Sequence, residues 1–493
     1  MDESSQSERS LVHKYGKHKK KYKIEAQKVK ELRKQSERSQ LLLQEEGGFL
    51  EADANEHCYQ ISQKEIVQSL DITAATKHFE LNLEFGPYSV NYFRNGRQLL
   101  LGGERGHVAA IDWVTKDLLC EFNAMESVHD ICWLHMPTMF AVAQKDWVHV
   151  YDNQGTEVHC LKKLFRVKKL TFLPYHFLLV SASENAMLSW TDVSIGKIIA
   201  SFRPPKAKTI TAMCQNPANA VILTAHSNGT VSMFTPNSNE PVVKMLCSPC
   251  SITGVAVNDT GLYMATTGVD RSIKIWDVRN YQCLQSYKLR AIPNCLCFSQ
   301  KNLLSVGIGN VVEVYKDCCT QVAEEPYIRH KLESSMISNV QFCNYEDVLG
   351  IGHRNGFVSI LVPGSGEPNF DAYESNPFMT KSQRREMEVK QLLEKIQPEL
   401  ISLDPHHLAK VDVKTLKQKL EEKSKLLYVK PRKIEFESSK KMSGVKKAKV
   451  KKDLQESVNR EHIQQVMKMK RKEDEKEKDA NKSYNVLDRF KRK

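Results

Sequence analysis

"YMATTGVDRSIKIWD", residues 263–277, joins an apolar stretch to a second stretch through a tight turn containing Gly268 and Asp270. In the second stretch apolar and polar side chains alternate, as in a β-strand that buries one face. It ends at Trp276-Asp277, the one Trp-Asp pair in the chain. The segment therefore predicts two short strands joined by a turn, and the fold depends on whether this unit recurs.

Six further segments repeat the pattern. In chain order they are "LLLGGERGHVAAID", "MFAVAQKDWVHVYD", "LLVSASENAMLSWTD", "VILTAHSNGTVSMFT", "LLSVGIGNVVEVYKD" and "VLGIGHRNGFVSILV". The residues at the Trp276 position are Ile111, Tyr151, Trp190, Phe234, Tyr315 and Leu361. Successive separations along all seven units are 40, 39, 44, 42, 39 and 46 residues, and another strand-like segment precedes each unit. A period of about 40–45 residues with four strands per unit is typical of WD repeats.

The chain thus resembles the seven-bladed WD-repeat β-propellers, an all-β fold, over residues 78–365. Asp270 and Trp276 match the turn aspartate and strand tryptophan of that family, but their usual histidine partner is missing. We therefore expect apolar packing between blades to hold most of the structure. The alternating segment "HFELNLE" (78–84) is predicted to close the ring beside "FVSIL" (357–361). Two β-sandwiches would fit the strands, but not one period over seven units.

The positive charge of the chain lies at its two ends. Residues 1–46 have a net charge of +4 and residues 371–493 a net charge of +12, whereas residues 47–370 have a net charge of −3. Basic arms on a nearly neutral body favour a polyanion partner, most often nucleic acid. No stretch approaches the roughly 18 apolar residues of a membrane span, and the polar start predicts no signal peptide. We expect a cytosolic or nuclear protein with reduced cysteines.

No motif in the sequence predicts catalysis or a cofactor. Phosphate-loop, HExxH and GxSxG patterns are all missing. Cys247 and Cys250 form a CxxC pair with no second pair at zinc spacing. Four histidines recur in the first two units without the spacing of convergent ligands: His107, His129, His149 and His159. We expect no enzyme activity, metal, cofactor or small-molecule substrate, although an enzyme with an unrecognised site remains the second alternative.

The N-terminal extension, residues 1–77, contains the basic run "HKYGKHKKKYK" (13–23). Its lysines can neutralise phosphates, and its tyrosines can stack on unpaired bases. The same run is also typical of a nuclear-import signal. From Tyr22 to Glu46 the composition predicts a helix. The candidate phosphate contacts of this arm are Lys17, Lys19, Lys20, Lys21 and Lys23.

The segment after the repeats, "NFDAYESNPFMTKSQRREMEVKQLLEKI" (369–396), differs sharply from them. Thr380 and Gln383 predict a capping box at the start of a helix. Apolar residues then recur on one helical face, with basic residues around it pointing outward. The predicted docking anchors are Phe370, Tyr373, Asn376, Pro377, Phe378, Val389, Leu392, Leu393 and Ile396, and the predicted phosphate contacts are Arg384 and Arg385. We expect the apolar face to pack on the propeller or on another protein.

This segment resembles the C-terminal signature of one WD-repeat family, as do "LLLQEEGGFLEAD" (41–53) and "FGPYSVNYFRNGRQLLLGG" (85–103). The family is that of the small-subunit processome proteins associated with the U-three small nucleolar RNA (yeast U-three-associated protein seven and its animal counterparts). The resemblance implies a nuclear, nucleolar, non-enzymatic scaffold that is needed for pre-ribosomal RNA processing to 18S RNA and for small-subunit assembly. It implies as partners pre-ribosomal RNA, the U-three-containing particle and other processome proteins, including WD-repeat proteins, and no membrane. The first alternative is an adaptor of another nuclear complex, such as a ubiquitin-ligase receptor or a chromatin-associated scaffold.

The expected organisation has four parts. They are a basic helical extension (1–77), the propeller (78–365), a family-specific strap with helices (366–429) and a basic tail (430–493). The tail is so rich in charge that we expect it to be largely disordered when free. Lys446 and Lys447 are its candidate phosphate contacts.

Overall fold

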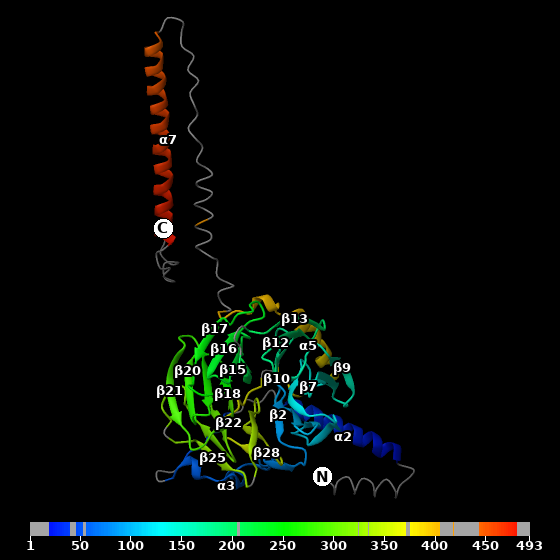
Figure 1. The fold of residues 1–493 in the computed structure, drawn as a ribbon. Coiled ribbons are helices and arrows are strands. Elements are labelled where there is room, and N and C mark those ends of the chain that lie inside the picture. Colours follow the sequence, from blue (N-terminus) through cyan, green and yellow to red (C-terminus); the bar gives the residue numbers. More distant parts are fainter. Residues whose placement is uncertain are drawn as a thin grey trace, which may run out of the picture. The chain divides into compact units, whose positions relative to one another are not determined.

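The computed structural model describes residues 19–39, 46–52, 56–204, 208–323, 325–333, 335–370, 375–404, 418 and 443–480. Within this part of the chain lie seven four-stranded antiparallel sheets, which are the blades of a β-propeller (Figure 1). The seven-bladed fold predicted from the sequence is confirmed. The chain divides into two compact units, Met1–Leu408 and Ala409–Lys493. No described helix is long and apolar enough to cross a membrane.

Blades are numbered here in chain order, and each runs from its inner to its outer strand. Blade 1 is β2 (Tyr88–Tyr92), β3 (Gln98–Gly103), β4 (His107–Asp112) and β5 (Asp117–Asn123); blade 2 is β6 (Val128–Trp133), β7 (Met139–Gln144), β8 (Val148–Asp152) and β9 (Glu157–Leu161); blade 3 is β10 (Val167–Leu173), β11 (Leu178–Ser183), β12 (Leu188–Asp192) and β13 (Lys197–Phe202); blade 4 is β14 (Ile210–Gln215), β15 (Ile222–His226), β16 (Thr230–Phe234) and β17 (Val243–Leu246). Blade 5 is β18 (Ile252–Val257), β19 (Tyr263–Gly268), β20 (Ser272–Asp277) and β21 (Gln282–Lys288); blade 6 is β22 (Pro293–Phe298), β23 (Leu304–Ile308), β24 (Val311–Tyr315) and β25 (Ile328–Lys331); blade 7 is β26 (Ile337–Phe342), β27 (Val348–His353), β28 (Gly356–Leu361) and β1 (Phe79–Asn82).

The ring closes through a strand from the start of the propeller. β1 pairs antiparallel with β28, with Phe79 opposite Ser359 and Leu81 opposite Phe357. The inner strands form a continuous circle, because each contacts the next and β26 contacts β2. At this seam Gly96 adopts a positive φ of 71°, and a Cβ there would lie 2.0 Å from the carbonyl oxygen of Asn344. Only glycine fits this close approach between the first and last blades.

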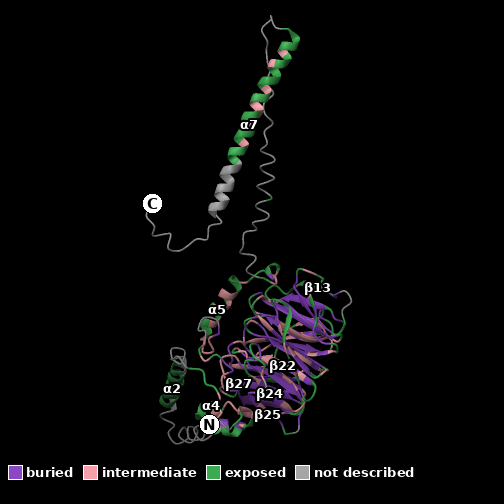
Figure 2. Ribbon diagram, turned by 90° about the vertical axis from the view of Figure 1, so that its left-hand side faces the viewer, coloured by how far each residue is buried: buried purple, intermediate pink, exposed green. Residues whose placement is uncertain are grey.

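Burial follows the position of a strand within its blade (Figure 2). The second strands are buried at every residue, as in β11 and β27, or at every residue but the first, as in β3, because neighbouring blades cover both of their faces. The outer strands, such as β5 and β21, have many exposed residues. This explains why apolar runs, rather than alternating ones, mark the second strands in the sequence.

Blade 5 contains part of the side-chain hydrogen-bond network that is typical of WD repeats. Trp276 donates from Nε1 to Oγ1 of Thr266 at 3.0 Å, and Asp270 accepts hydrogen bonds from Ser272 at 2.8 Å and Ser248 at 3.3 Å. Serine thus contacts the turn aspartate, where histidine does so in better-matched WD repeats. All thirteen cysteines are free thiols; Cys247 is buried and Cys250 is exposed.

The N-terminal extension is helical in part and packs on blades 6 and 7 from Leu50 onward. Its elements are α2 (Lys19–Ser39), η3 (Cys58–Gln60), α3 (Gln63–Ser69) and α4 (Ile72–Ala75). The side-chain amide of Gln63 donates to the carbonyl oxygen of Leu361 at 3.0 Å and accepts from the Leu361 backbone amide at 2.9 Å. Ile66 is buried beside it, and the Leu50 amide donates to the hydroxyl of Tyr327 at 2.7 Å.

After the propeller the chain forms α5 (Lys381–Leu393) and η4 (Pro398–Leu400) in the first unit, and α7 (Gly444–Ala480) in the second. The helix α7 differs from the disorder expected for the tail. Lys and Glu are its commonest residues and no proline interrupts it, so helix propensity and i,i+4 side-chain pairs favour a helix even though few apolar residues are available for burial. The boundaries that we expected for the four parts stay predictions.

Candidate interaction surface

The segment from Asn369 to Asp404, called the strap below, crosses one face of the propeller. Its residues 371–374, including the predicted anchor Tyr373, lie outside the described part. The strap contacts blades 7, 1, 2, 3 and 4 in turn, at the loops that join first to second strands and third to outer strands. It therefore lies on the same face across five consecutive blades.

The first contact lies at the seam between blades 7 and 1. Phe370 packs against Tyr345, with ring centroids 5.3 Å apart, and against Phe378 at 6.4 Å. The guanidinium of Arg97 lies over the Phe378 ring at 5.8 Å and donates to the carbonyl oxygen of Pro377 at 3.2 Å. Arg97 also forms an ion pair with Asp112 at 2.7 Å, which fixes its position in blade 1. The aromatic anchors thus bridge the two ends of the ring.

The local sequence explains this geometry. The side chain of Asn376 accepts a hydrogen bond from the Phe378 amide at 2.8 Å, which forms a turn ahead of α5. Thr380 then caps α5: its hydroxyl accepts from the Gln383 amide at 3.2 Å, and the Gln383 side chain accepts from the Thr380 amide at 3.0 Å. The capping box predicted from the sequence is confirmed.

The helix α5 lays a polar face on the propeller. Glu388 lies 3.4 Å from Nε2 of His135 in blade 2. The half-buried residues of the helix and its end are Arg384, Met387, Glu388, Lys390, Gln391 and Lys395, and all of them except Lys390 recur at helical spacing on one face. The ammonium of Lys395 pairs with Asp192 and hydrogen-bonds to Ser194 at 2.8 Å.

The predicted apolar stripe points elsewhere. Exposed fractions are 57% for Val389, 42% for Leu392, 82% for Leu393 and 39% for Ile396. The propeller therefore leaves this stripe largely uncovered. Lys395, expected to point outward, is instead only 12% exposed, because Asp192 at the end of β12 pairs with it. That expectation was wrong.

The pairing shifts the ionisation of Asp192. Burial acts to raise the pKa of this carboxyl, but hydrogen bonds from Lys395 and Ser194 outweigh burial and hold the pKa below its usual range. The carboxylate therefore stays ionised, so the ion pair holds the end of α5 at neutral pH. The Ile396 amide adds a hydrogen bond to the carbonyl oxygen of Tyr175 at 3.0 Å.

The end of the strap enters the core. Ile401 is 3% exposed and joins the apolar cluster of blades 3, 4 and 5, with Leu403 packed beside it. Two asparagines of blade 4 hold the backbone around it. Asn237 donates to the carbonyl oxygen of Glu399 at 2.8 Å, and Asn219 donates to that of Leu403 at 3.0 Å. Sequence reasoning missed these contacts, although "PELISL" (398–403) does contain the apolar residues that make them.

The predicted phosphate contacts are spread over the chain. Lys21 and Lys23 are exposed on α2, Arg385 is exposed and Arg384 half-buried on α5, and Lys446 and Lys447 lie in the first turn of α7. Lys17 lies outside the described residues, and the side chains of Lys19 and Lys20 are not described. These cations come from three separate helices, and their use as phosphate contacts stays a prediction.

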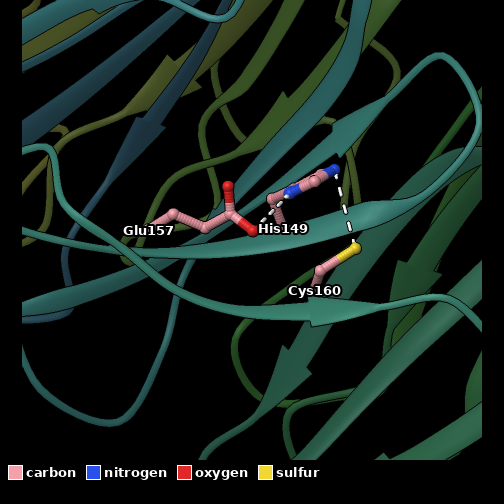
Figure 3. A group of neighbouring side chains, drawn as sticks. All are labelled: His149, Glu157 and Cys160. Atoms are coloured by element: carbon pink, nitrogen blue, oxygen red, sulfur yellow. Dashed lines mark hydrogen bonds and ion pairs between the residues drawn. The ribbon is translucent and has the colours of Figure 1, made fainter.

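One side-chain cluster in blade 2 resembles a reactive site (Figure 3). His149 faces the carboxylate of Glu157 through Nδ1 at 3.3 Å and the thiol of Cys160 through Nε2 at 3.8 Å. It is the one group of three candidate metal ligands among the described residues. The sequence spacing did not single out this group, because the pairing of β8 with β9 and a bulge in that pairing bring the three side chains together.

The cluster is not arranged for chelation. Glu157 and Cys160 face opposite nitrogens of the ring, and a metal ion takes one nitrogen of an imidazole. Burial, with the nearby Glu157 carboxylate, raises the pKa of the Cys160 thiol, which keeps it protonated and a weak ligand. We therefore interpret the cluster as a side-chain contact between β8 and β9, the third and outer strands of blade 2.

Comparison with known proteins agrees with this architecture. Residues 326–404 match the BING4CT (NUC141) domain, which covers the outer strand of blade 6, three strands of blade 7 and the strap, and residues 240–277 match the WD domain, G-beta repeat. WD repeat-containing protein 46 is 46% identical in Caenorhabditis elegans, over 91% of this chain and 79% of that protein, and 45% identical in Homo sapiens, over 98% and 80%. U3 small nucleolar RNA-associated protein 7 of Saccharomyces cerevisiae is 41% identical over 75% of this chain and 70% of that protein. At this identity and coverage, the chain belongs to the family that includes WD repeat-containing protein 46 and U3 small nucleolar RNA-associated protein 7.

Proposed function

We propose that the protein is a non-enzymatic scaffold of the small-subunit processome, needed for pre-ribosomal RNA processing to 18S RNA and for small-subunit assembly. Its relative in yeast is named for association with U3 small nucleolar RNA. Ribosome assembly takes place in the nucleolus, so we propose a nuclear, nucleolar location. Its partners would be the U3-containing particle, pre-ribosomal RNA and other processome proteins, including WD-repeat proteins.

The observation that carries the scaffold role is the strap. It is fixed to five blades, yet it holds the apolar stripe of α5 away from the propeller. Exposed apolar side chains at helical spacing fit the groove of a protein partner. The basic residues of the arms, such as Lys21, Lys446 and Arg385, would add phosphate contacts, whose strength falls as salt rises.

The test is purification of the tagged full chain from cells, with U3 small nucleolar RNA and pre-ribosomal RNA quantified. Leu393→Glu places a charge in the stripe and should lower both RNAs several-fold. Gln397→Glu is the matched control, because it adds the same charge at an exposed residue just beyond the helix. Equal recovery with both variants would show that the stripe is not the docking surface. If the unaltered protein instead recovers ubiquitin-ligase subunits or chromatin without either RNA, the processome proposal is wrong.

A further inference from the structure

An exposed group of aromatic and cationic side chains lies where blades 2 and 3 meet. We call it the blade 2/3 patch, and it consists of Lys145, Trp147, Lys162, Lys163, Phe165 and Arg166. It comes from two loops, the turn from β7 to β8 and the connection from β9 to β10. Trp147 is 38% exposed and Phe165 is 50% exposed. Single exposed rings are common on protein surfaces, but aromatic rings that gather with cations are typical of an interaction site.

The two loops are fixed to each other. The Arg166 amide donates to the carbonyl oxygen of Asp146 at 2.9 Å, and the Glu184 amide of blade 3 donates to the carbonyl oxygen of Arg166 at 3.0 Å. Leu164 and Val167 are 2% and 1% exposed, so the loop is anchored on both sides of Phe165. The ring of Phe165 is therefore held outward by buried neighbours.

The cations lie beside the rings. The ammonium of Lys162 is 5.8 Å from the centre of the Trp147 ring, and the guanidinium of Arg166 is 5.2 Å from that of Phe165. The two loops carry four cations and one carboxylate, Asp146, with Glu184 on the adjacent turn. Residues 47–370 as a whole have a net charge of −3, so this local excess is not a general property of the propeller.

The strap leaves the patch open. It contacts the loops that join first to second strands, such as the loop that carries His135 between β6 and β7. In an antiparallel blade, the turn from β7 to β8 lies at the other end of the same strands. The patch and the strap therefore occupy opposite faces of the propeller.

We propose that the blade 2/3 patch binds single-stranded RNA, with unpaired bases stacked on Trp147 and Phe165 and phosphates held by Lys162, Lys163 and Arg166. Single-strand binding surfaces combine stacking rings with a cationic track in this way. An acidic peptide would satisfy the cations but would leave the two rings without an equivalent partner. The inference rests on the proposed function, which supplies the RNA that the patch would bind in the cell. It adds an RNA-binding site on the propeller to the phosphate contacts proposed for the two basic arms.

The test uses the full chain and a labelled oligouridylate, because uridylate has little secondary structure. The double variant Trp147→Ala/Phe165→Ala should weaken binding by about tenfold for each stacked base. Binding is measured at raised salt, where the electrostatic contribution of the arms is small. Tyr281→Ala is the control, since Tyr281 is also 38% exposed but belongs to the loop between β20 and β21. Ultraviolet crosslinking with mass spectrometry should place uridine on Trp147 or Phe165.

The charge is tested separately. Lys162→Ala/Lys163→Ala should reduce the slope of log affinity against log salt by about 0.7 for each phosphate that is no longer neutralised, whereas Lys197→Ala, another exposed lysine, should not change it. Unchanged affinity in the aromatic variant, with crosslinks confined to the arms, would overturn the proposal. If the lysine variant fails to bind a labelled oligoglutamate but still binds oligouridylate fully, the proposal is also overturned, and the patch is assigned to an acidic protein segment.

Failure here is separable from failure of the proposed function. If the aromatic variant keeps oligouridylate affinity but the protein recovers U3 RNA from cells, only the patch assignment is wrong. If the patch binds oligouridylate but no U3 or pre-ribosomal RNA is recovered from cells, only the processome proposal is wrong.

Discussion

Truncating Ile401 should release the end of the strap while the propeller stays folded. The Ile401 side chain is 3% exposed and lies in the cluster of blades 3 to 5. An isoleucine-to-alanine change at such a site costs about 2–5 kcal/mol. The other contacts of this segment are Leu403 and the two asparagine hydrogen bonds, each worth about 1 kcal/mol. Removing Ile401 therefore takes away a large share of what holds residues 398–404 in place.

Amide hydrogen exchange measures this release directly. A loss of about 2 kcal/mol corresponds to roughly 30-fold faster opening, so exchange in a peptide covering 397–404 should accelerate by at least that factor in Ile401→Ala. The amides of Leu400 and Ile401 report it, because they donate to the carbonyl oxygens of Gln397 and Pro398. Exchange in β14 to β17 should stay close to that of the unaltered protein.

Leu400→Ala provides the matched control. Leu400 is the preceding residue and belongs to η4, but it is 44% exposed, so its truncation should change exchange little. Equal acceleration in both variants would show that exchange follows the stability of η4 itself. Equal acceleration in the strap and in the strands of blade 4 would show that the strap is an inseparable part of the core, which contradicts our reasoning.

Two further predictions concern titratable groups. Burial lowers the pKa of His176 to about 4, below the usual value of about 6.5, so the unfolded chain binds a proton that the folded chain excludes. The free energy of unfolding should therefore fall by up to about 3 kcal/mol as pH drops from about 6.5 to 4. In urea unfolding, His176→Gln should show a weaker dependence of this free energy on pH, and an equal dependence in both proteins would contradict the assignment. The raised pKa of Cys160 keeps the thiol protonated, so its alkylation by iodoacetamide should be slow at neutral pH. If Cys160 is instead labelled rapidly, and if His149→Ala abolishes that labelling, the histidine activates the thiol.

The sequence predicted the propeller because burial of the inner strands requires apolar residues at regular intervals along the chain. The second strand of each blade is covered on both sides, so its apolar run survives wherever the Trp-Asp signature is lost, as in "LLVSAS" (178–183). The closing pair was also readable, since β1 alternates and lies just before the first repeat. These features depend on neighbours along the chain or on a fixed period.

The strap contacts could not be read from the sequence in the same way. Arg97 and Pro377 are 280 residues apart, and they meet only because the ring closes between them. The orientation of α5 was predicted from its apolar stripe, but the ion pair with Asp192 and the contact with His135 turn a polar face toward the propeller. Periodicity identifies which residues share a face, and it does not identify what that face meets.

The cluster around His149 is another feature that the sequence did not predict. Cys160 lies directly opposite His149 across the β8–β9 hairpin, which a regular register predicts. Glu157 would fall on the other face in that register, because it is three residues from Cys160. A bulge at Val150 and Tyr151 shifts the pairing and places Glu157 opposite Tyr151, on the face that His149 shares. Nothing in the local sequence marks this bulge.

The strap also keeps the two proposed binding surfaces apart. Its aromatic anchors join Tyr345 of blade 7 to Arg97 of blade 1, so the seam that β1 closes by hydrogen bonds is closed a second time by side chains. The same segment then covers one face and turns the apolar stripe of α5 outward, while the blade 2/3 patch stays open on the other face. If the stripe binds protein and the patch binds RNA, the two partners approach from opposite faces and need not compete. In that case Leu393→Glu and Trp147→Ala/Phe165→Ala should act independently. The losses of binding free energy in the two variants should add in the combined variant, because contacts on opposite faces share no side chain.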